Sequence, residues 1–308
     1  MNGRRPPIAG AARRRMGSGL ARLGFDRSWV VRRFVKLGHP RLREFDLRVQ
    51  TTPLLQAAIE PARRWLNAKP IQIPTGLAHG MWISKSDLPL THAHLGSVAF
   101  GNLEASVQEA LLRHLGPGDV FYDIGANLGF FALLGARLVG PEGRVFAFEP
   151  APANAGAIIR NAALNGFENV EVIEKAVSAR GGHGRLQIVD DQSWSKLTEY
   201  GEHPGTEEVV TVELTSVDEL VGAGKAPPPR AVKIDVEGAE IAVLEGMRRT
   251  LTEHGPAVIC ELHDTHAEFV AVMASCGYRT INLEGTAPVT QTGASAHVLA
   301  LPLLHPGD

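Results

Sequence analysis

The 308-residue chain is predicted to fold as an α/β domain around a mainly parallel sheet, preceded by a basic extension. Two observations lead to this prediction. From residue 120 onward, apolar runs of strand length alternate with segments of helix length, a pattern typical of right-handed βαβ units. Apolar residues make up 44% of the chain and charged residues 21%, as in ordinary globular proteins with a core of their own.

The segment from Met1 to Arg48 is strongly basic. It holds twelve arginines and one lysine against three acidic residues, although the whole chain has a net charge of -2. Residues 1–19 are rich in Arg, Gly, Ala and Pro and have little apolar surface to bury, so we expect a disordered leader. A basic arm also suits contact with nucleic acid or anionic lipid, and this one superficially resembles a transit peptide.

Residues 20–99 are expected to form an extension of short helices and strands. Apolar residues at helical spacing run through 20–66, where several prolines interrupt them. Between Ile71 and Ser84 the pattern changes to short strands and turns.

Several features favour a cytoplasmic protein. No apolar run approaches the length of about 18 residues that a membrane-spanning helix needs, so we expect no transmembrane helix. No apolar core follows the N-terminal charges, which argues against a secretory signal. The two cysteines, Cys260 and Cys276, are too few for a disulfide framework, and we expect both to be reduced.

The main domain is predicted to span residues 100–304. It begins with a helix at 104–115, which the Gly-Pro-Gly-Asp turn at 116–119 ends. Strands are predicted at 120–124, 145–148, 170–173, 184–189, 207–214, 231–235, 257–262, 279–282 and 297–301, and further helices at 130–138, 154–165, 239–251 and 268–275.

The first candidate ligand site is the segment Asp123-Ile124-Gly125-Ala126-Asn127-Leu128-Gly129 between a strand and a helix. Gly125 permits a tight turn and a close approach of a ligand, and the free N–H groups of the helix that Gly129 opens favour a carboxylate or phosphate. A dinucleotide fingerprint needs a second glycine where Ala126 and Asn127 stand, so a pyrophosphate is disfavoured. Asp123 suits a positive amino group, and S-adenosylmethionine carries both an ammonium and a carboxylate.

The second candidate is Glu149, which ends the strand Val145-Phe146-Ala147-Phe148 and precedes Pro150. Its separation from Gly125 along the chain is close to the interval, about 20 residues, at which an acidic residue binds ribose hydroxyls. Together the two elements predict a site for a nucleoside-type ligand.

At this point the sequence resembles the FkbM-type S-adenosylmethionine-dependent methyltransferases. The resemblance covers roughly residues 100–285 and rests on segments 122–130, 148–150, 175–178, 215–220, 232–240 and 243–246, with Asn154 and Asn165. It implies a class I methyltransferase (Rossmann-like) sheet of seven strands, six parallel and the last antiparallel. It also implies methyl transfer, usually to an oxygen of a small molecule or sugar. The segment 1–70 does not match the family pattern.

The resemblance also implies residue roles. Asp123, Gly125 and Gly129 would hold the methionine moiety, Glu149 the ribose, and Ala176–Val177 would border the adenine. With the neighbouring Ala126, Asn127 and Pro150, these residues are the predicted cofactor site.

The acceptor should bind at the ends of the strands 231–235 and 257–262. A hydroxyl acceptor must lose its proton, which requires a base or a metal ion. Asp235 stands where the first of these strands leaves the sheet, and Glu237 follows two residues later. Glu240 falls at a helix start, where the helix dipole stabilises a carboxylate. Lys233 lies inside an apolar strand and is interpreted as an ion-pair partner.

Glu261 and His263 share one face of the second strand. His263 is a candidate general base, with Asp235 and Glu237 as further catalytic candidates. The same residues could instead only position the acceptor, or bind a divalent cation. Their spacing is not a metal signature, so no metal ligand is predicted.

Other features of the sequence give weaker evidence of function. His92 and His94 resemble a metal pair but have no partner motif, and Trp194 either lines the acceptor pocket or is a plain loop aromatic. The alternatives to a methyltransferase are a nicotinamide-dependent oxidoreductase and a non-catalytic, methyltransferase-like binding protein. We expect a small-molecule or sugar acceptor; RNA is disfavoured because no aromatic residues interleave the arginines. Neither the identity of the acceptor nor the oligomeric state can be predicted.

Overall fold

The structure, a computed structural model, describes residues 70–84, 98, 101–189, 195–201 and 206–303. The chain divides into two compact units, residues 1–86 with 92–101 and residues 87–91 with 102–308. The domain boundary predicted near residue 99 stays a prediction. The predicted helices in 20–66, the basic leader, His92, His94 and Trp194 all lie outside the described residues.

In the first unit, β1 (Ile71–Gln72) pairs antiparallel with β2 (Trp82–Ile83). The Gln72 side chain donates a hydrogen bond to the carbonyl of Gly80, at 3.1 Å, and so closes the turn between the strands. These are the short strands and turns expected between residues 71 and 84.

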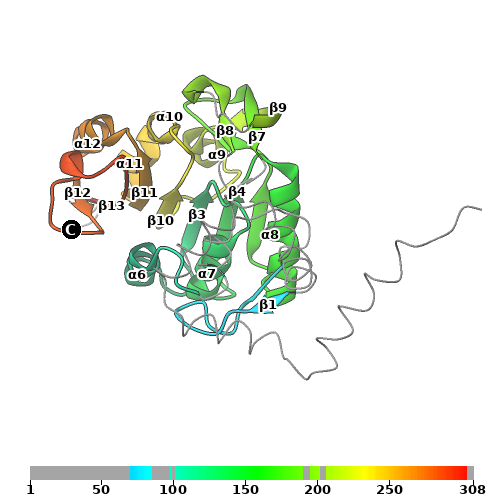
Figure 1. The fold of residues 1–308 in the computed structure, drawn as a ribbon. Helices are drawn as coiled ribbons and strands as arrows, with labels where there is room; N and C mark the ends of the chain where they lie inside the picture. Colours follow the sequence, from blue (N-terminus) through cyan, green and yellow to red (C-terminus); the bar gives the residue numbers. More distant parts are fainter. Residues whose placement is uncertain (1–69, 85–97, 99–100, 190–194, 202–205, 304–308) are drawn as a thin grey trace, which may run out of the picture. The chain divides into compact units, whose positions relative to one another are not determined.

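The second unit is built on a seven-stranded sheet with the order β12-β13-β11-β10-β3-β4-β5 (Figure 1). Six strands run parallel, and β13 runs antiparallel to both of its neighbours. The predicted class I methyltransferase sheet is therefore confirmed. The strands are β3 (Val120–Ile124), β4 (Arg144–Phe148), β5 (Val170–Ile173), β10 (Ala231–Ile234), β11 (Ala257–His263), β12 (Tyr278–Asn282) and β13 (Ser295–Pro302).

The central strands are apolar because helices cover both faces of the sheet. Every residue of β10 is buried, as are four of the five residues of both β3 and β4. Tyr122 packs against the rings of Phe146 and Phe148, with centroids 5.2 and 5.5 Å away. Its hydroxyl donates to the carbonyl of Pro227 at 2.8 Å, so the one polar atom of this buried ring is satisfied.

Two groups of helices flank the sheet (Figure 1). The chain moves one way from β3 through β5 and the opposite way from β10 through β11, so right-handed crossovers place the connecting helices on opposite faces. The first group is α6 (Ala105–His114), α7 (Phe130–Val139) and α8 (Pro152–Asn165); the second is α9 (Val217–Gly222), α10 (Glu240–Glu245), α11 (Arg248–His254) and α12 (His266–Ser275). The strand order reverses between β3 and β10, where ligands of open α/β sheets bind.

A second, four-stranded sheet with the order β6-β9-β7-β8 is inserted between β5 and β10. Two of its strands, β7 (Gly182–Val189) and β9 (Thr206–Thr215), correspond to the strands predicted at 184–189 and 207–214, and they pair antiparallel. The short strands β6 (Ala176–Val177) and β8 (Lys196–Leu197) were not predicted as strands.

The single helix predicted at 239–251 is wrong: α10 ends at Glu245 and α11 begins at Arg248. The cause lies in a distant segment. The Asp218 carboxylate accepts hydrogen bonds from the backbone N–H groups of Arg249 and Thr250, at 2.9 and 2.8 Å, and so caps α11. A Cβ on Gly246 would overlap the carbonyl oxygen of Ser178, so only glycine fits at the break.

None of the helices in the described part of the chain has the length and apolar character needed to cross a membrane.

Candidate functional site

The candidate site is a pocket at the carboxyl ends of β3, β4 and β10. Its walls come from the loops after these strands and from β6, β7 and β8 of the small sheet. Eight predicted site residues line it: Gly125, Asn127, Glu149, Pro150, Ala176, Val177, Asp235 and Glu237. Among the predicted residues that do not line the pocket, Asp123 lies in β3, Ala126 and Gly129 belong to the loop after β3, and His263 lies next to Glu237.

The loop after β3 has the backbone that its glycines allow. Gly125 has a φ of +82°, and a Cβ there would overlap the carbonyl oxygen of Asp235 and lie 2.9 Å from its carbonyl carbon. Gly125 therefore permits close contact between the ends of β3 and β10. Gly129 is the N-cap of α7 and has a φ of +85°. A Cβ at this position would lie 3.1 Å from the Ile158 side chain of α8, so the absence of a side chain lets α7 and α8 pack closely.

Asp123, the last but one residue of β3, is fully buried. Neither carboxylate oxygen accepts a hydrogen bond of good geometry from the described residues, although the Ala132 backbone N–H lies close enough to lower the pKa of Asp123. The Asn127 side-chain oxygen has no hydrogen-bond partner among the described residues. Burial raises the pKa of Asp123 to about 6, against the opposing charge of Lys233. The Asn127 oxygen lines the pocket, so it can accept a hydrogen bond from an N–H or O–H group of a ligand.

Glu149 is held rigidly at the end of β4. Its two carboxylate oxygens accept hydrogen bonds from the backbone N–H groups of Asn127, at 2.8 Å, and Ala151, at 2.9 Å. Burial raises its pKa to about 7, although these hydrogen bonds act in the opposite direction. The Asn154 side chain also hydrogen-bonds this carboxylate, which keeps capacity to accept hydroxyl groups.

On β10, the Lys233 ammonium lies 2.9 Å from Asp235 Oδ2 and 4.7 Å from the centre of the Phe131 ring. Lys233 is buried, and burial alone would lower its pKa, but Asp235 and other nearby carboxylates raise it. The interpretation of Lys233 as an ion-pair partner agrees with this geometry. Burial raises the pKa of Asp235, and Lys233 opposes that rise.

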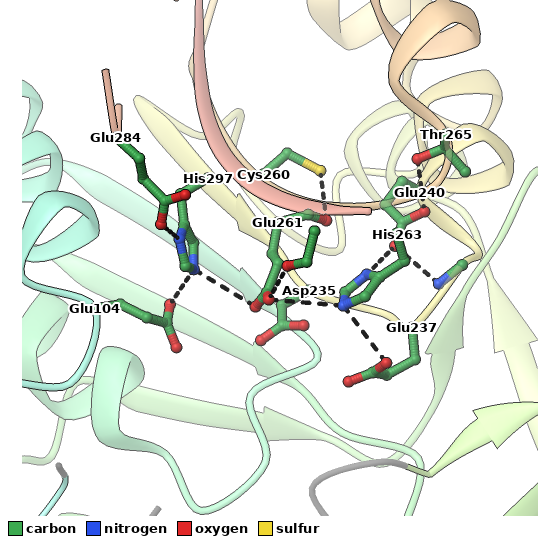
Figure 2. A network of polar contacts seen from close by, with 12 residues as sticks. Glu104, Asp235, Glu237, Glu240, Cys260, Glu261, His263, Thr265, Glu284 and His297 are labelled. Atoms are coloured by element: carbon green, nitrogen blue, oxygen red, sulfur yellow. Dashed lines mark hydrogen bonds and ion pairs between the residues drawn. The ribbon is translucent and has the colours of Figure 1, made fainter. Parts of the chain in front are cut away.

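His263 lies among three carboxylates at the end of β11 (Figure 2). Nδ1 is 2.9 Å from Glu240 Oε1, and Nε2 is 3.5 Å from Glu237 and 3.7 Å from Glu261. Burial alone would lower the pKa of His263, but the hydrogen bond to Glu240 and the charge of Glu237 raise it to about 9. The ring is therefore mainly protonated at pH 7, and the predicted base role requires the proton to leave first.

Glu240 is more than a helix-start residue. Its side chain is completely buried, and its carboxylate accepts hydrogen bonds from the Gly238 N–H, at 2.8 Å, and the Thr265 hydroxyl, at 3.1 Å, besides contacting His263. Glu237 has a φ of +51°, a left-handed conformation that is uncommon outside glycine. This turn places Glu237 and Glu240 on either side of the imidazole (Figure 2).

A second imidazole network adjoins the first, and sequence reasoning missed it. His297 Nδ1 lies 2.6 Å from Glu284, and its Nε2 lies 3.3 Å from Glu104 and 3.6 Å from Glu261. These hydrogen bonds and charges raise the pKa of His297 to about 11, although burial acts in the opposite direction. Glu104 and His297 are far apart in the sequence, and no local pattern marks them as partners.

Comparisons with known proteins agree with this geometry. Residues 123–280 match the family model described as the methyltransferase FkbM domain. The chain is 32% identical over 161 residues to the hexuronic acid methyltransferase AglP of Haloferax volcanii, covering 52% of this chain and 62% of that protein. It is 27% identical over 225 residues to the 31-O-demethyl-FK506 methyltransferase FkbM of Streptomyces tacrolimicus, covering 62% of this chain and 86% of that protein.

Among solved structures, a methyltransferase FkbM from Methylobacillus flagellatus aligns with a TM-score of 0.41 and 15% identity, over 68% of this chain and 54% of that chain. The chain thus matches less than two thirds of the length of AglP and nearly nine tenths of that of the Streptomyces protein.

Proposed function

Because the chain belongs to the FkbM methyltransferase family, we propose that it transfers a methyl group from S-adenosylmethionine to a hydroxyl oxygen of a small molecule or sugar. Membership confirms the family that the sequence motifs predicted. The matching residues, 123–280, include the glycine loop, Glu149 and the carboxyl ends of β10 and β11. No observation on the described residues favours the nicotinamide-dependent oxidoreductase.

The pocket contains groups that fit each part of S-adenosylmethionine. Glu149, fixed by two backbone N–H groups, would accept the two ribose hydroxyls, and this arrangement is the observation that carries the proposal. The Asn127 side-chain oxygen would accept a hydrogen bond from the ammonium group, and the carboxylate of Asp123, buried beside the pocket lining, would add favourable charge. The buried pair Ala176–Val177 would border the adenine, as expected from the sequence.

When bound, S-adenosylmethionine supplies an electrophilic methyl group: the acceptor oxygen bonds to this carbon while the carbon–sulfur bond breaks, the electron pair stays on sulfur, and the hydroxyl proton must leave. The chain must therefore hold the hydroxyl in line and help its proton to depart. Asp235 and Glu237 line the same pocket as Glu149 and would accept a hydrogen bond from that hydroxyl. His263, in contact with Glu237, completes the proposed catalytic group.

The names of the relatives give one indication of the class of acceptor, and the residues of the site give another. The name of one relative specifies a hexuronic acid, and that of the other an O-demethylated FK506. We propose an acceptor with several oxygen substituents, because the described residues at the ends of β10 and β11 are carboxylates and imidazoles, which bind hydroxyl groups well.

Calorimetry with S-adenosylmethionine and its demethylated product tests the donor half of the proposal. Glu149→Ala should weaken binding at least tenfold, because two charge-assisted hydrogen bonds are lost. Glu171→Ala is the matched control, since Glu171 lies on the neighbouring strand β5 in an exposed ion pair with Arg144. If the wild-type protein bound neither compound, the proposal would be wrong.

The acceptor half requires product formation. Wild-type protein is incubated with methyl-labelled cofactor and a panel of neutral sugars, a hexuronic acid and hydroxylated macrolides. Transfer of label to a hydroxyl oxygen, located in the product by NMR, is the expected result. A protein that binds the donor but labels no acceptor in a broad panel would instead favour the non-catalytic binding protein.

A further inference from the structure

Three potential ligand groups meet at the acceptor end of the pocket. Asp235 follows β10, Glu237 lies two residues later, and His263 ends β11; one ligand atom from each lies within 4.8 Å of the others (Figure 2). Their side chains are 23%, 26% and 23% exposed, so the group is partly shielded from water. Asp235 and Glu237 line the pocket, and His263 lies next to Glu237.

Each of the three residues has a ligand atom to spare. Lys233 binds Oδ2 of Asp235, which leaves Oδ1 available. Glu237 and His263 Nε2 are 3.5 Å apart, too far for a good hydrogen bond. This separation leaves these atoms as two potential ligands of a single ion.

The imidazole is oriented as a metal-ligating histidine is. A carboxylate only accepts hydrogen bonds, so Nδ1 carries the proton in its 2.9 Å contact with Glu240, and Nε2 faces Glu237. Glu240 is itself completely buried and is fixed by Gly238 and Thr265. Histidine ligands in proteins generally donate their second N–H to a carboxylate held in this way.

The surrounding charge also calls for a cation. Within the described part of this network, six carboxylates face three cationic groups. The carboxylates are those of Glu104, Asp235, Glu237, Glu240, Glu261 and Glu284, and the cations are Lys233, His263 and His297. A divalent ion bound in place of the Nε2 proton would offset part of this excess.

We propose that Asp235, Glu237 and His263 bind a divalent cation, and that Glu240 is the positioning residue that holds the imidazole. Two carboxylates and one imidazole suit a first-row transition ion such as Mn²⁺ better than Ca²⁺. Three protein ligands leave positions open for water or substrate. The role of the ion rests on the proposed function: an acceptor hydroxyl bound to it loses its proton to water more readily, which leaves a nucleophilic oxygen.

A neighbouring cluster of Glu104, Glu261 and His297 does not qualify as a second site. None of these three residues lines the pocket, whereas Asp235 and Glu237 do. The cluster is an ion-pair network that ties the start of α6 to β11 and β13.

The test is a titration of the chelator-treated full-length protein with Mn²⁺, followed by electron paramagnetic resonance, without cofactor or acceptor. We expect saturable binding of one ion that weakens at least tenfold in His263→Gln and in Glu237→Gln, and ten- to a hundredfold in Glu240→Gln. Glu284→Gln is the matched control, since it removes a carboxylate of the same network outside the site and should leave affinity within twofold.

Circular dichroism of each variant separates loss of the ligand from loss of the fold. Should His263→Gln unfold, Glu237→Gln carries the test, because the Glu237 side chain is partly exposed in a turn. Absence of saturable Mn²⁺ binding, or binding that neither variant weakens, overturns the proposal. The titration contains no methyl donor, so failure to bind Mn²⁺ would not contradict the proposed methyl transfer. Failure to bind the donor in the calorimetry would not contradict the proposed metal site.

Discussion

The close contact between Gly125 and Asp235 makes a quantitative prediction for Gly125→Ala. The new methyl group would overlap the Asp235 carbonyl oxygen, and φ at this residue is +82°. The left-handed conformation costs an alanine about 1 kcal/mol. Relief of the overlap must also separate the ends of β3 and β10 and break the hydrogen bond from the Asp235 N–H to the Ile124 carbonyl, now 2.9 Å long. An unsatisfied buried backbone group costs about 1–3 kcal/mol, so we expect a total loss of about 3 kcal/mol.

Urea unfolding followed by circular dichroism measures this loss, with Gly166→Ala as the matched control. Gly166 ends α8 with a φ of +66°, and a Cβ there meets nothing within 4 Å. Gly166→Ala therefore introduces backbone strain without a steric overlap, and its free energy of unfolding should fall by about 1 kcal/mol. Gly125→Ala should also abolish binding of S-adenosylmethionine, whereas Gly166→Ala should keep it. Equal losses of stability in the two variants would refute the steric explanation.

Two further predictions concern buried charges. A ribose diol donates hydrogen bonds to the ionised form of Glu149, and burial raises the pKa of this residue to about 7. The affinity for the demethylated cofactor should therefore rise with pH up to about 7, at most tenfold per pH unit, and then level off. Calorimetry from pH 5.5 to 8.5 checks this, and Glu149→Gln should remove the dependence near pH 7. Lys233→Met should lower the free energy of unfolding by about 2 kcal/mol, less than for a fully buried pair because Asp235 is partly exposed. In urea unfolding, adding Asp235→Asn should restore part of that loss; a further drop would contradict the ion-pair explanation.

The sheet could be predicted because its signals are local. β3 and β5 were predicted to the residue, since runs rich in β-branched and aromatic residues favour strands, and the segments around them contain glycine. The loop after β3 and Glu149 were located for the same reason: each follows directly on a strand, and the carboxyl ends of parallel strands share one edge.

What could not be predicted depends on contacts between distant segments. The end of α10 at Glu245 is set by Asp218, which caps α11 from another element. The burial of Glu240 depends on His263 and Thr265, which belong to a later strand and the turn after it. The His297 network joins residues from α6, β11 and β13, and no periodicity along the chain relates them. The short strands β6 and β8 contain two residues each, too few for any pattern.

The charges at the ends of β10 and β11 connect the proposed cation site with the class of acceptor that can bind. With no cation bound, Asp235, Glu237 and the adjoining carboxylates repel an anionic group, because like charges in a partly desolvated site cost several kcal/mol. A divalent ion between Asp235 and His263 would reduce this repulsion and give an acidic or polyhydroxylated acceptor a point of attachment. The occupancy of the metal site therefore determines which acceptors can approach the methyl group, and the two properties have to be measured on the same preparation of the protein.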